Sequence, residues 1–472
     1  MWTRFLLVRG LMLSLSVVTL PAAAETLQEA MAAAYGDNPT LLSERAKLRS
    51  TDELVPQALA NWRPSVSLNG NATRTNLNTS ISTGAVTSGP PGTTVTNTSI
   101  YNNQTVGLQV QEALYRGGRT VAQTEQAEAQ VSAERATLSV TEQQVLLNVA
   151  TAYLNLVQAQ AVLQLSINNE QVLQRQLDAT EDRFRVGEVT RTDVAQAQSR
   201  LAGAHSDRVQ SEGNVRTARA AYAQTVGHQP DKAEMPSQLP AILPVSIDQA
   251  RSDAQRDNPN IIAARFNYDA ASAAVDLVAG ELLPVVSVTG SAQRVYNFDG
   301  PQSLEKVAQV VVGVTVPLYQ QGQEYARLRG QKETVSQNRH ILDQAQRDVE
   351  DATSSSWEAL QTGKARRASY ESQIKAAEIA LEGVQRENQV GSRTVLDVLN
   401  AEQELLTAQV NAVQAQHDEM LAAYQVLNAV GHLTAQRMGL GVELYDPGRH
   451  YEEVRDKWIG FGDQPDLVKT GK

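Results

Sequence analysis

The residues best suited to chemistry lie in two short polar segments, each following a long stretch of helical character. Each segment holds a glycine and then a Thr-x-x-Asp pattern: Thr190 with Asp193, and Thr394 with Asp397. Glycine at a helix end takes the left-handed cap, and Thr-x-x-Asp fits a capping box that opens the next helix. The sequence therefore predicts two tight helix–turn–helix connections, each with a carboxylate at its tip.

No other pattern indicates catalysis or metal binding. The six histidines, at positions 205, 228, 340, 417, 432 and 450, are scattered and form no His-Glu-x-x-His motif. No Gly-x-Ser-x-Gly elbow occurs, and Gly363-Lys364 lacks the rest of a phosphate-binding loop. The absence of cysteine excludes disulfides, thiolate zinc sites and a lipid anchor through an N-terminal cysteine. We expect no enzyme, no cofactor and no metal.

The elements that position these turns belong to a unit that occurs twice. Asn38-Pro39 returns as Asn258-Pro259, 220 residues later, and Gly227 returns as Gly431, 204 residues later. The offset falls between residues 64 and 114, so the first copy holds 16 extra residues there. Residues 76–103 are rich in Ser, Thr, Asn and Gly and are predicted to form an exposed loop. A duplicated unit restricts the possible folds severely.

Each copy is predicted to contain two strands, at about residues 64–74 and 101–112 and at about 284–296 and 305–317. Apolar residues alternate with polar ones in all four, which gives each strand one apolar face. Such strands are typical of outer-membrane barrels, although strands of a soluble sheet share the pattern. Because the smallest barrels have about eight strands, four must be shared between chains. Two chains would give a filled interior, and three would give twelve strands.

Long helices follow the strands. Residues 119–185 contain no proline or glycine and would span about 100 Å as a helix. Apolar and small residues recur in them at seven-residue spacing, which predicts a coiled-coil seam. The seam consists of Val149, Leu156 and Leu163, with Val145, Ala152 and Ala159 between them. The counterpart helix is predicted over residues 323–387 with a break at Gly363, and return helices over 192–225 and 395–429.

The N-terminus is typical of a cleaved export signal. Arg4 and Arg9 stand at the start of an apolar run over residues 6–20, and three alanines precede Glu25. Cleavage before Glu25 removes two arginines and no acid, so the net charge changes from -11 to -13. This acidic balance argues against nucleic acid as a partner. Beyond residue 24 we expect no apolar stretch near the roughly 18 residues of a membrane helix, so any membrane contact would use strands.

The predicted organisation is therefore a signal peptide, two repeats and a tail. The signal peptide covers residues 1–24, and the first repeat covers 25–245 with a helical hairpin at 117–228. The second repeat covers 246–436 with a hairpin at 321–432, and the tail covers 437–472. The last residues, 460–472, are expected to be loose.

Over about residues 25–440, this pattern resembles the TolC-like outer-membrane channels of the outer membrane efflux protein family. The resemblance is carried by the duplicated order, the strands that follow a proline, and the Val-Gly-x-x-Thr-x-x-Asp-Val turns. Its most specific part is the second turn, residues 391–401, with the sequence Gly-Ser-Arg-Thr-Val-Leu-Asp-Val-Leu-Asn-Ala. The tail from Gly439 to Val454 resembles the type I secretion branch.

The resemblance implies a passive homotrimer in the outer membrane of a Gram-negative bacterium. Four strands per chain would form a shared twelve-stranded barrel, and the helical hairpins would form a periplasmic tube closed at its far end. A periplasmic adaptor (membrane fusion) protein and an inner-membrane ABC or proton-driven transporter would dock there and open it. Outer-membrane lipid would surround the barrel.

By the same resemblance, the turns form the closed end. Asp397 and Asn400 match the constriction, where Asn400 stands in place of a second aspartate. Arg393 matches an arginine that latches the hairpins together, with Thr192 and Asp193 as partners and Asn388 in place of a tyrosine. These departures imply a weaker latch or a different set of bonds. The adaptor-docking turns would contain Val186, Gly187, Val390 and Gly391.

Three alternatives remain open on the sequence. Asp193 and Asp397 would serve only as helix caps, and Arg393 only as a solvated arginine. In the second alternative, the chain is a multidrug-efflux channel for small molecules and not a protein-secretion channel. In the third, it is a soluble periplasmic coiled-coil adaptor, which shares the signal and the hairpins but does not require two paired sets of amphipathic strands.

Overall fold

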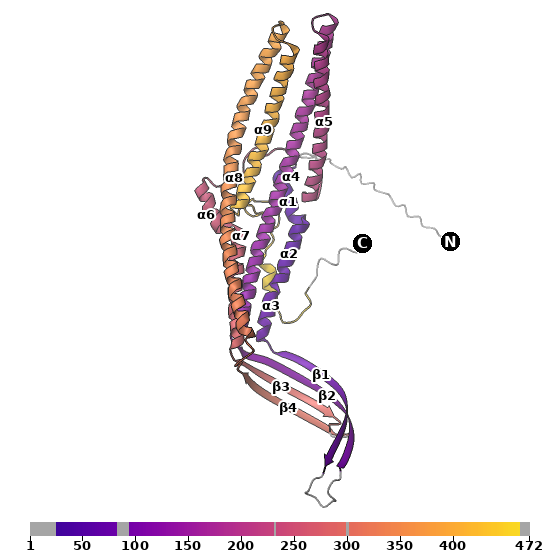
Figure 1. The fold of residues 1–472 in the computed structure, drawn as a ribbon, viewed down its shortest axis with the longest axis vertical. Helices are drawn as coiled ribbons and strands as arrows, with labels where there is room; N and C mark the ends of the chain where they lie inside the picture. The colour runs from indigo at the N-terminus through magenta and orange to yellow at the C-terminus, as the bar shows by residue number, and fades with distance from the viewer. Residues whose placement is uncertain (1–24, 83–93, 231–232, 299–301, 463–472) are drawn as a thin grey trace, which may run out of the picture.

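The chain forms a bundle of long helices that ends in a four-stranded sheet (Figure 1). The computed structural model describes residues 25–82, 94–230, 233–298 and 302–462. The predicted signal peptide lies outside the described residues, as do residues 463–472 of the tail. Both halves run in the same order of short helices, two strands, a long helix and a return helix. The structure confirms the mainly helical, duplicated fold.

The first copy contains α1 (Leu27–Asp37), α2 (Pro39–Asp52), α3 (Leu54–Leu59), β1 (Ser65–Ser82), β2 (Thr94–Arg116), α4 (Arg119–Arg185) and α5 (Arg191–Val226). The second contains α6 (Ile247–Asp257), α7 (Pro259–Ala279), β3 (Val285–Tyr296), β4 (Leu304–Thr315), α8 (Gln323–Gln389) and α9 (Val395–Ala429). Single 3-10 turns, η1 (Ala60–Trp62) and η2 (Gly280–Leu282), lead into β1 and β3, and the tail contains α10 (Arg449–Val454).

The sheet has the order β1-β2-β3-β4, and every neighbouring pair is antiparallel. Its register places most of the apolar residues of all four strands on one face, although Leu77, Val295, Val307 and Val311 lie on the other. One apolar row across the sheet is Leu68, Leu108, Ala292 and Ala308, and the adjacent polar row is Ser67, Gln109, Ser291 and Gln309. The two copies therefore form one continuous two-faced sheet, as the alternation predicted.

The first hairpin is longer than the sequence analysis predicted. β1 and β2 stay paired as far as Ser82 and Thr94, so most of the predicted loop over residues 76–103 is a two-stranded ribbon. Its polar side chains cannot build a core, but the two backbones satisfy each other and the many β-branched threonines favour strands. Within residues 76–103, only residues 83–93, which include Gly89-Pro90-Pro91-Gly92, lie outside the described residues. The ribbon extends past the end of β3 and β4 (Figure 1).

The two long helices are equal in length. α4 and α8 each contain 67 residues, so each extends about 100 Å. α8 continues through Gly363, where a break was predicted. A Cβ atom at Gly363 would lie 2.9 Å from Cα of Glu419, so the glycine lets α9 pass close to α8. In α4 the predicted seam residues Val149 and Leu156 are fully buried.

α4 corrects one expectation from the sequence. It contains a stretch that is long and apolar enough to cross a membrane by length and composition, although none was expected after residue 24. Half of that stretch is buried inside the molecule. Leu146, Tyr153 and Leu154 of α4 belong to the largest buried cluster, together with residues of α1, α5 and α9. Core packing between helices accounts for this composition.

The repeated Asn-Pro pairs clamp the helical hairpins to the short helices. Asn38 Oδ1 caps α2 by accepting from Thr40 N at 3.0 Å, and its amide donates to Thr225 O near the end of α5 at 3.1 Å. Asn258 caps α7 in the same way, and its amide donates to Ala429 O at the end of α9 at 2.8 Å. One side chain thus joins three chain segments in each copy, which explains why the motif occurs twice.

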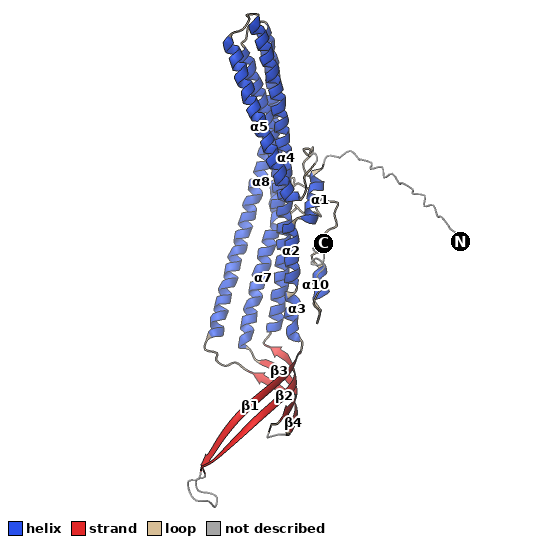
Figure 2. Cartoon of the chain, turned by 90° about the vertical axis from the view of Figure 1, so that its right-hand side faces the viewer, coloured by secondary structure: helices blue, strands red, loops and turns tan. Residues whose placement is uncertain are grey.

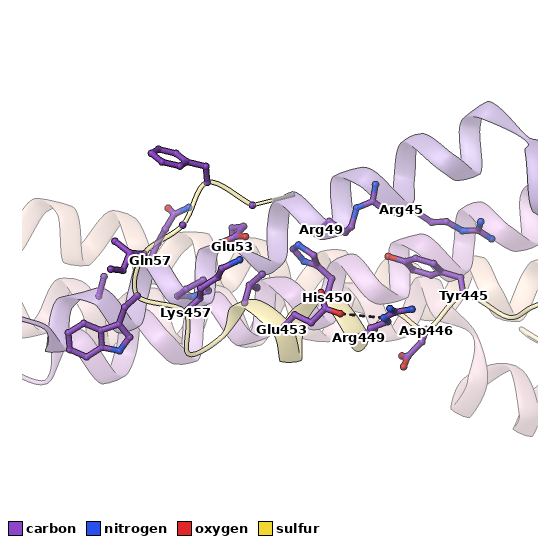
Figure 3. Close-up of a pocket in the computed structure, with 18 of the residues that line it drawn as sticks. Arg45, Arg49, Glu53, Gln57, Tyr445, Asp446, Arg449, His450, Glu453 and Lys457 are labelled. Atoms are coloured by element: carbon purple, nitrogen blue, oxygen red, sulfur yellow. Dashed lines mark hydrogen bonds and ion pairs between the residues drawn. The ribbon is translucent and has the colours of Figure 1, made fainter. Parts of the chain in front are cut away.

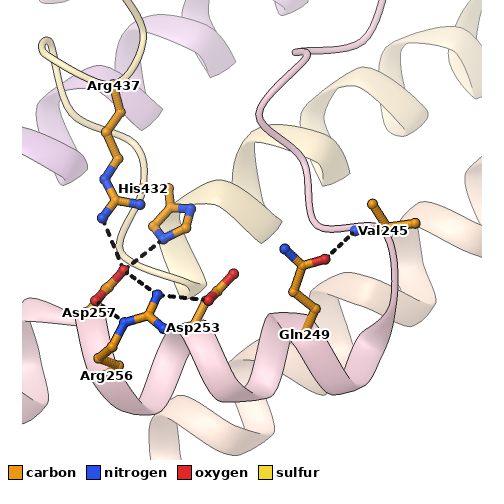
Figure 4. A network of polar contacts seen from close by, with 7 residues as sticks. All are labelled: Val245, Gln249, Asp253, Arg256, Asp257, His432 and Arg437. Carbon is orange, nitrogen blue, oxygen red and sulfur yellow. Dashed lines mark hydrogen bonds and ion pairs between the residues drawn. The ribbon is translucent and has the colours of Figure 1, made fainter.

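Among the residues that the structure describes, a second clamp occurs only in the later copy (Figure 4). Asp257 Oδ2 accepts from His432 Nε2 at 3.1 Å and from Arg437 Nη2 at 3.0 Å. Arg256 Nε lies 2.8 Å from the other carboxylate oxygen. Arg256, followed by His432 and Arg437, lowers the pKa of Asp257 well below its usual range. This network ties the end of α6 to the segment that follows α9.

The C-terminal tail packs along α2 and α3 (Figure 3). The guanidinium of Arg45 lies between two rings, 4.6 Å from the centre of Tyr35 and 5.0 Å from that of Tyr445. His450 Nδ1 lies 3.1 Å from the fully buried carboxylate of Asp52. Burial raises the pKa of Asp52, while His450 opposes that rise. The tail is therefore ordered at least as far as α10.

Candidate functional site

The two helix–turn–helix connections lie at the end of the molecule opposite to the sheet (Figure 1). Gly187 and Gly391 both have φ of 81°, the left-handed conformation that glycine favours. The following residues close the helix ends, with Glu188 N donating to Arg183 O at 2.9 Å and Ser392 N donating to Glu387 O at 3.0 Å. The valines before the glycines, Val186 and Val390, are 71% and 80% exposed. Each tip thus presents an apolar side chain on a rigid turn.

Both predicted capping boxes are present. Asp193 Oδ2 accepts from Thr190 N at 2.8 Å and from the Thr190 hydroxyl at 2.7 Å. Asp397 Oδ2 accepts from Thr394 N at 2.9 Å and from the Thr394 hydroxyl at 2.8 Å. The Thr394 backbone bond, with its hydroxyl and nearby Arg393, lowers the pKa of Asp397. The carboxylate is therefore held in its charged form at the tip of the hairpin.

Two asparagines connect the hairpins of the two copies. Asn388 Oδ1 accepts from Arg183 Nη1 of α4 at 3.1 Å, while its amide donates to Arg393 O at 2.8 Å. Asn400 Oδ1 on α9 accepts from Arg200 Nη2 of α5 at 2.9 Å. A side-chain amide can accept and donate at once, which suits Asn388 to join a neighbouring hairpin and its own turn. Asn388 and Asn400 are also the two positions where the resemblance implied a tyrosine and a second aspartate.

The side-chain partner of Arg393 within its own chain is a glutamate. Arg393 Nε lies 2.9 Å from Glu387 Oε2, on the same hairpin. Within the described part of a single chain, its side chain is not brought to Thr192 or Asp193, whose carboxylate accepts from Thr190. Arg393 is half exposed, so it remains accessible to a neighbouring molecule. Arg183, Arg200 and Glu387 were not predicted from the sequence as site residues.

A small apolar cluster lies beside the bonds that join the hairpins. It is formed by Leu173 on α4, Ala204 on α5, and Val395 and Leu399 on α9. Glu402 on α9 is also buried, and burial raises the pKa of its carboxyl group while Arg175 opposes the rise. The site as a whole is two capped hairpin tips held together by two arginine–asparagine bonds and an apolar contact. Such an arrangement can hold two helix pairs closed without covalent chemistry.

Comparisons with known proteins identify relatives across nearly the whole chain. The family model described as "Outer membrane efflux protein" matches residues 30–228 and 250–432. The outer membrane efflux protein BepC of Brucella suis is 36% identical over 458 residues, which cover 97% of this chain and 96% of that protein. The outer membrane protein TolC of Escherichia coli is 24% identical, covering 90% of this chain and 86% of TolC. The alkaline protease secretion protein AprF of Pseudomonas aeruginosa is 23% identical over 59% of this chain and 60% of AprF.

The fold also matches solved channel structures. The CmeC outer membrane channel of Campylobacter jejuni superimposes with a TM-score of 0.76 at 15% sequence identity. The match covers 91% of this chain and 89% of CmeC. At this identity the likeness concerns the fold alone.

Proposed function

Because the chain belongs to the outer membrane efflux protein family, we propose that it is a passive outer-membrane exit duct of a tripartite secretion or efflux system. Members of this family are outer membrane channels and not enzymes. In this proposal residues 1–24 direct export and are cleaved, and the mature chain sits in the outer membrane of a Gram-negative bacterium. Its helices extend far into the periplasm.

The observation that carries this proposal is the two-faced sheet with two open edges. All four strands share one apolar face, while β1 and β4 each have only one neighbour in the described chain. Unpaired strand edges are not tolerated in lipid, so the edges must pair with other chains. Eight strands from two chains would enclose only side chains. A homotrimer with about twelve strands leaves an open lumen and satisfies every edge.

The hairpin tips form the gate in this proposal. Arg183 with Asn388, and Arg200 with Asn400, hold the hairpins of one chain together. Asp397 and Asn400 line the constriction. Carboxylates from three chains brought close together there would attract cations.

The remaining predicted residues are assigned to contacts with other molecules. Arg393 is half exposed, and its side-chain partner in the described chain, Glu387, lies on its own hairpin. It is proposed to latch to Thr192 and Asp193 of a neighbouring chain, beside Asn388. The exposed turns with Val186, Gly187, Val390 and Gly391 are proposed to dock a periplasmic adaptor protein. An inner-membrane ABC or proton-driven transporter would complete the system, and no nucleic acid takes part.

For the cargo, we propose proteins exported by type I secretion. AprF is named for protease secretion, whereas BepC is named for efflux and has the higher identity, so small-molecule efflux is the alternative. Crosslinking in living cells, followed by identification of the captured inner-membrane transporter, separates the two. A captured drug transporter would overturn the secretion assignment and leave the channel assignment intact.

The channel itself is tested by reconstitution. The purified mature chain, inserted into planar lipid bilayers, is expected to give small resting currents and to migrate as a trimer after chemical crosslinking. A chain that fractionates with soluble periplasmic proteins and inserts into no bilayer would instead support the adaptor alternative. The paired strand sets make that alternative the weaker one.

A further inference from the structure

The end of the tail carries an exposed group of large apolar side chains. Trp458 and Ile459 are 68% and 91% exposed, and Phe461 is fully exposed. Lys457 precedes them and is exposed as well. Contiguous exposed apolar residues on an ordered segment mark an interaction surface, because soluble surfaces rarely retain them.

This segment, residues 457–461, is held at a defined place. Arg63 Nη1 donates to Lys457 O at 2.8 Å, and its guanidinium lies 4.7 Å from the ring of Trp458. Upstream, Arg455 Nη2 lies 3.5 Å from Glu128 Oε1 on α4. The tail lines a groove together with residues of α2 and α3, and Figure 3 shows His450 directed toward those helices.

The place is the junction between the helices and the sheet. Arg63 stands two residues before the start of β1, so the segment lies at the helix end of the strands. Figure 1 shows the described tail descending along α3 toward this junction. Other exposed aromatic side chains lie at the same end: Trp62 before β1, Tyr115 near the end of β2, and Tyr319 after β4.

Aromatic and apolar side chains mixed with Arg and Lys are the composition of membrane interfaces, where rings sit among the headgroups and cations meet phosphates. We propose that residues 457–461, with Arg63, dock onto the phospholipid headgroup region of the membrane leaflet at the helix end of the sheet. The segment lies at the end of the sheet where Trp62, Tyr115 and Tyr319 are exposed, as in an aromatic belt, and the cations beside it match phosphate. This inference rests on the proposed function, because it requires the sheet to lie in a membrane.

Tryptophan fluorescence in vesicles tests the inference. The chain has four tryptophans, at positions 2, 62, 357 and 458, and the first lies in the predicted signal peptide. Trp62→Phe with Trp357→Phe leaves Trp458 as the reporter in the mature chain. The vesicles contain phosphatidylethanolamine and phosphatidylglycerol, with or without phospholipid brominated high on one acyl chain. We expect bromination to reduce Trp458 emission and the emission maximum to lie at a shorter wavelength than in the chain unfolded in urea.

Two further reporters make the outcomes distinct. Trp357 alone, partly buried on α8 against an apolar cluster that includes Leu360 and Val426, is expected to be unaffected by brominated lipid. Val312→Trp, in a chain without other tryptophans, reports from the apolar face of β4. If Val312→Trp is quenched and Trp458 is not, the tail inference is overturned and the channel proposal stands. A blue-shifted but unquenched Trp458 would assign the segment to a second copy of the chain. If Val312→Trp is also unquenched, both proposals fail.

Discussion

Arg200 on α5 and Asn400 on α9 are joined by a hydrogen bond of 2.9 Å, although 200 residues separate them in the chain. Together with the bond between Arg183 and Asn388, it connects the hairpins of the two copies near their tips. In both pairs an arginine meets a neutral amide and not a carboxylate. Such bonds are weaker than paired charges, so the hairpins can be separated without leaving an unpaired acid.

Removing these arginines is expected to open the resting channel. Arg200→Ala deletes one exposed hydrogen bond, worth about 1 kcal/mol. Arg183→Ala deletes the bond to Asn388 and also the contact of Arg183 with Glu188 in the same turn. The double variant should therefore raise the resting conductance in planar bilayers more than either single variant. Arg216→Ala, which alters an exposed arginine on α5 far from the tip, is the matched control. Unchanged resting currents in the double variant would contradict a latch role for these bonds.

Cysteine pairs can separate contacts within a chain from contacts between chains, because the chain has no cysteine of its own. Arg200→Cys with Asn400→Cys should react with a short bifunctional thiol reagent inside one chain and leave a monomer on a denaturing gel. Arg393→Cys with Asp193→Cys should instead give crosslinked dimers and trimers, because we propose that Arg393 reaches Asp193 of a neighbouring chain. Within its own hairpin, Arg393 pairs with Glu387. Only monomers from the second pair would refute the proposed contact between chains.

The two capping boxes provide a controlled test of the constriction. Asp397→Ala should remove both the cap and the proposed ring of charge, so it should reduce cation preference in reversal-potential measurements across a salt gradient. Asp193→Ala removes the equivalent cap and a proposed latch partner of Arg393, so it should raise the resting conductance but leave the proposed ring of charge and its cation preference in place. Since Thr394 lowers the pKa of Asp397, cation preference in the wild type should persist at pH 5. Equal effects of the two variants would mean that both carboxylates are only caps.

The fold could be predicted largely from the duplication, whereas the contacts between hairpins could not. Glycine and Thr-x-x-Asp fixed the turns because their chemistry is local, and both boxes formed as predicted. The Arg183–Asn388 bond depends on how two mostly polar helices rotate against each other, and hydrophobic periodicity does not define that rotation. One feature of the sequence did point to these residues as a site of difference between the copies. Arg183 and Glu387 occupy equivalent positions in the two copies and carry opposite charges.

The loop predicted over residues 76–103 differs from the structure for another physical reason. Their composition indicated a loop, yet Asn76 pairs with Ile100 and Leu77 with Ser99 in a regular ladder. Composition reports whether side chains can form a core, but a two-stranded ribbon satisfies its backbone without one. Continuation from strands that are anchored in the sheet decided the structure here.

The repeat also offers a test of close packing at the second clamp. Gly227 and Gly431 are equivalent and both have positive φ, but only Gly431 faces a neighbour, with its Cβ position 2.5 Å from Asp257 O. Gly227→Ala should cost about 1–2 kcal/mol from the left-handed backbone alone. Gly431→Ala adds overpacking and should lower the thermal midpoint, followed by circular dichroism in detergent, clearly further. Equal decreases in the thermal midpoint would show that the backbone at Asp257 shifts to accommodate the added methyl group.

The Asp257 network makes stability depend on pH in a defined direction. Arg256, then His432 and Arg437, lower the folded-state pKa of Asp257 below the unfolded value of 3.8. The folded state is therefore favoured by the charged carboxylate at pH above 3.8, and this contribution is lost as the pH falls through the lowered pKa. Asp257→Asn should cost about 1–3 kcal/mol at neutral pH, because it removes charge-assisted bonds. The difference from wild type should shrink in strongly acidic solution, when thermal midpoints are compared across pH.

Asp37→Asn, the exposed equivalent in the first copy, should change stability little at any pH. If the Asp257→Asn difference were the same at neutral and acidic pH, the loss would come from packing, and the ion pairs would contribute nothing to holding α6 against the segment after α9.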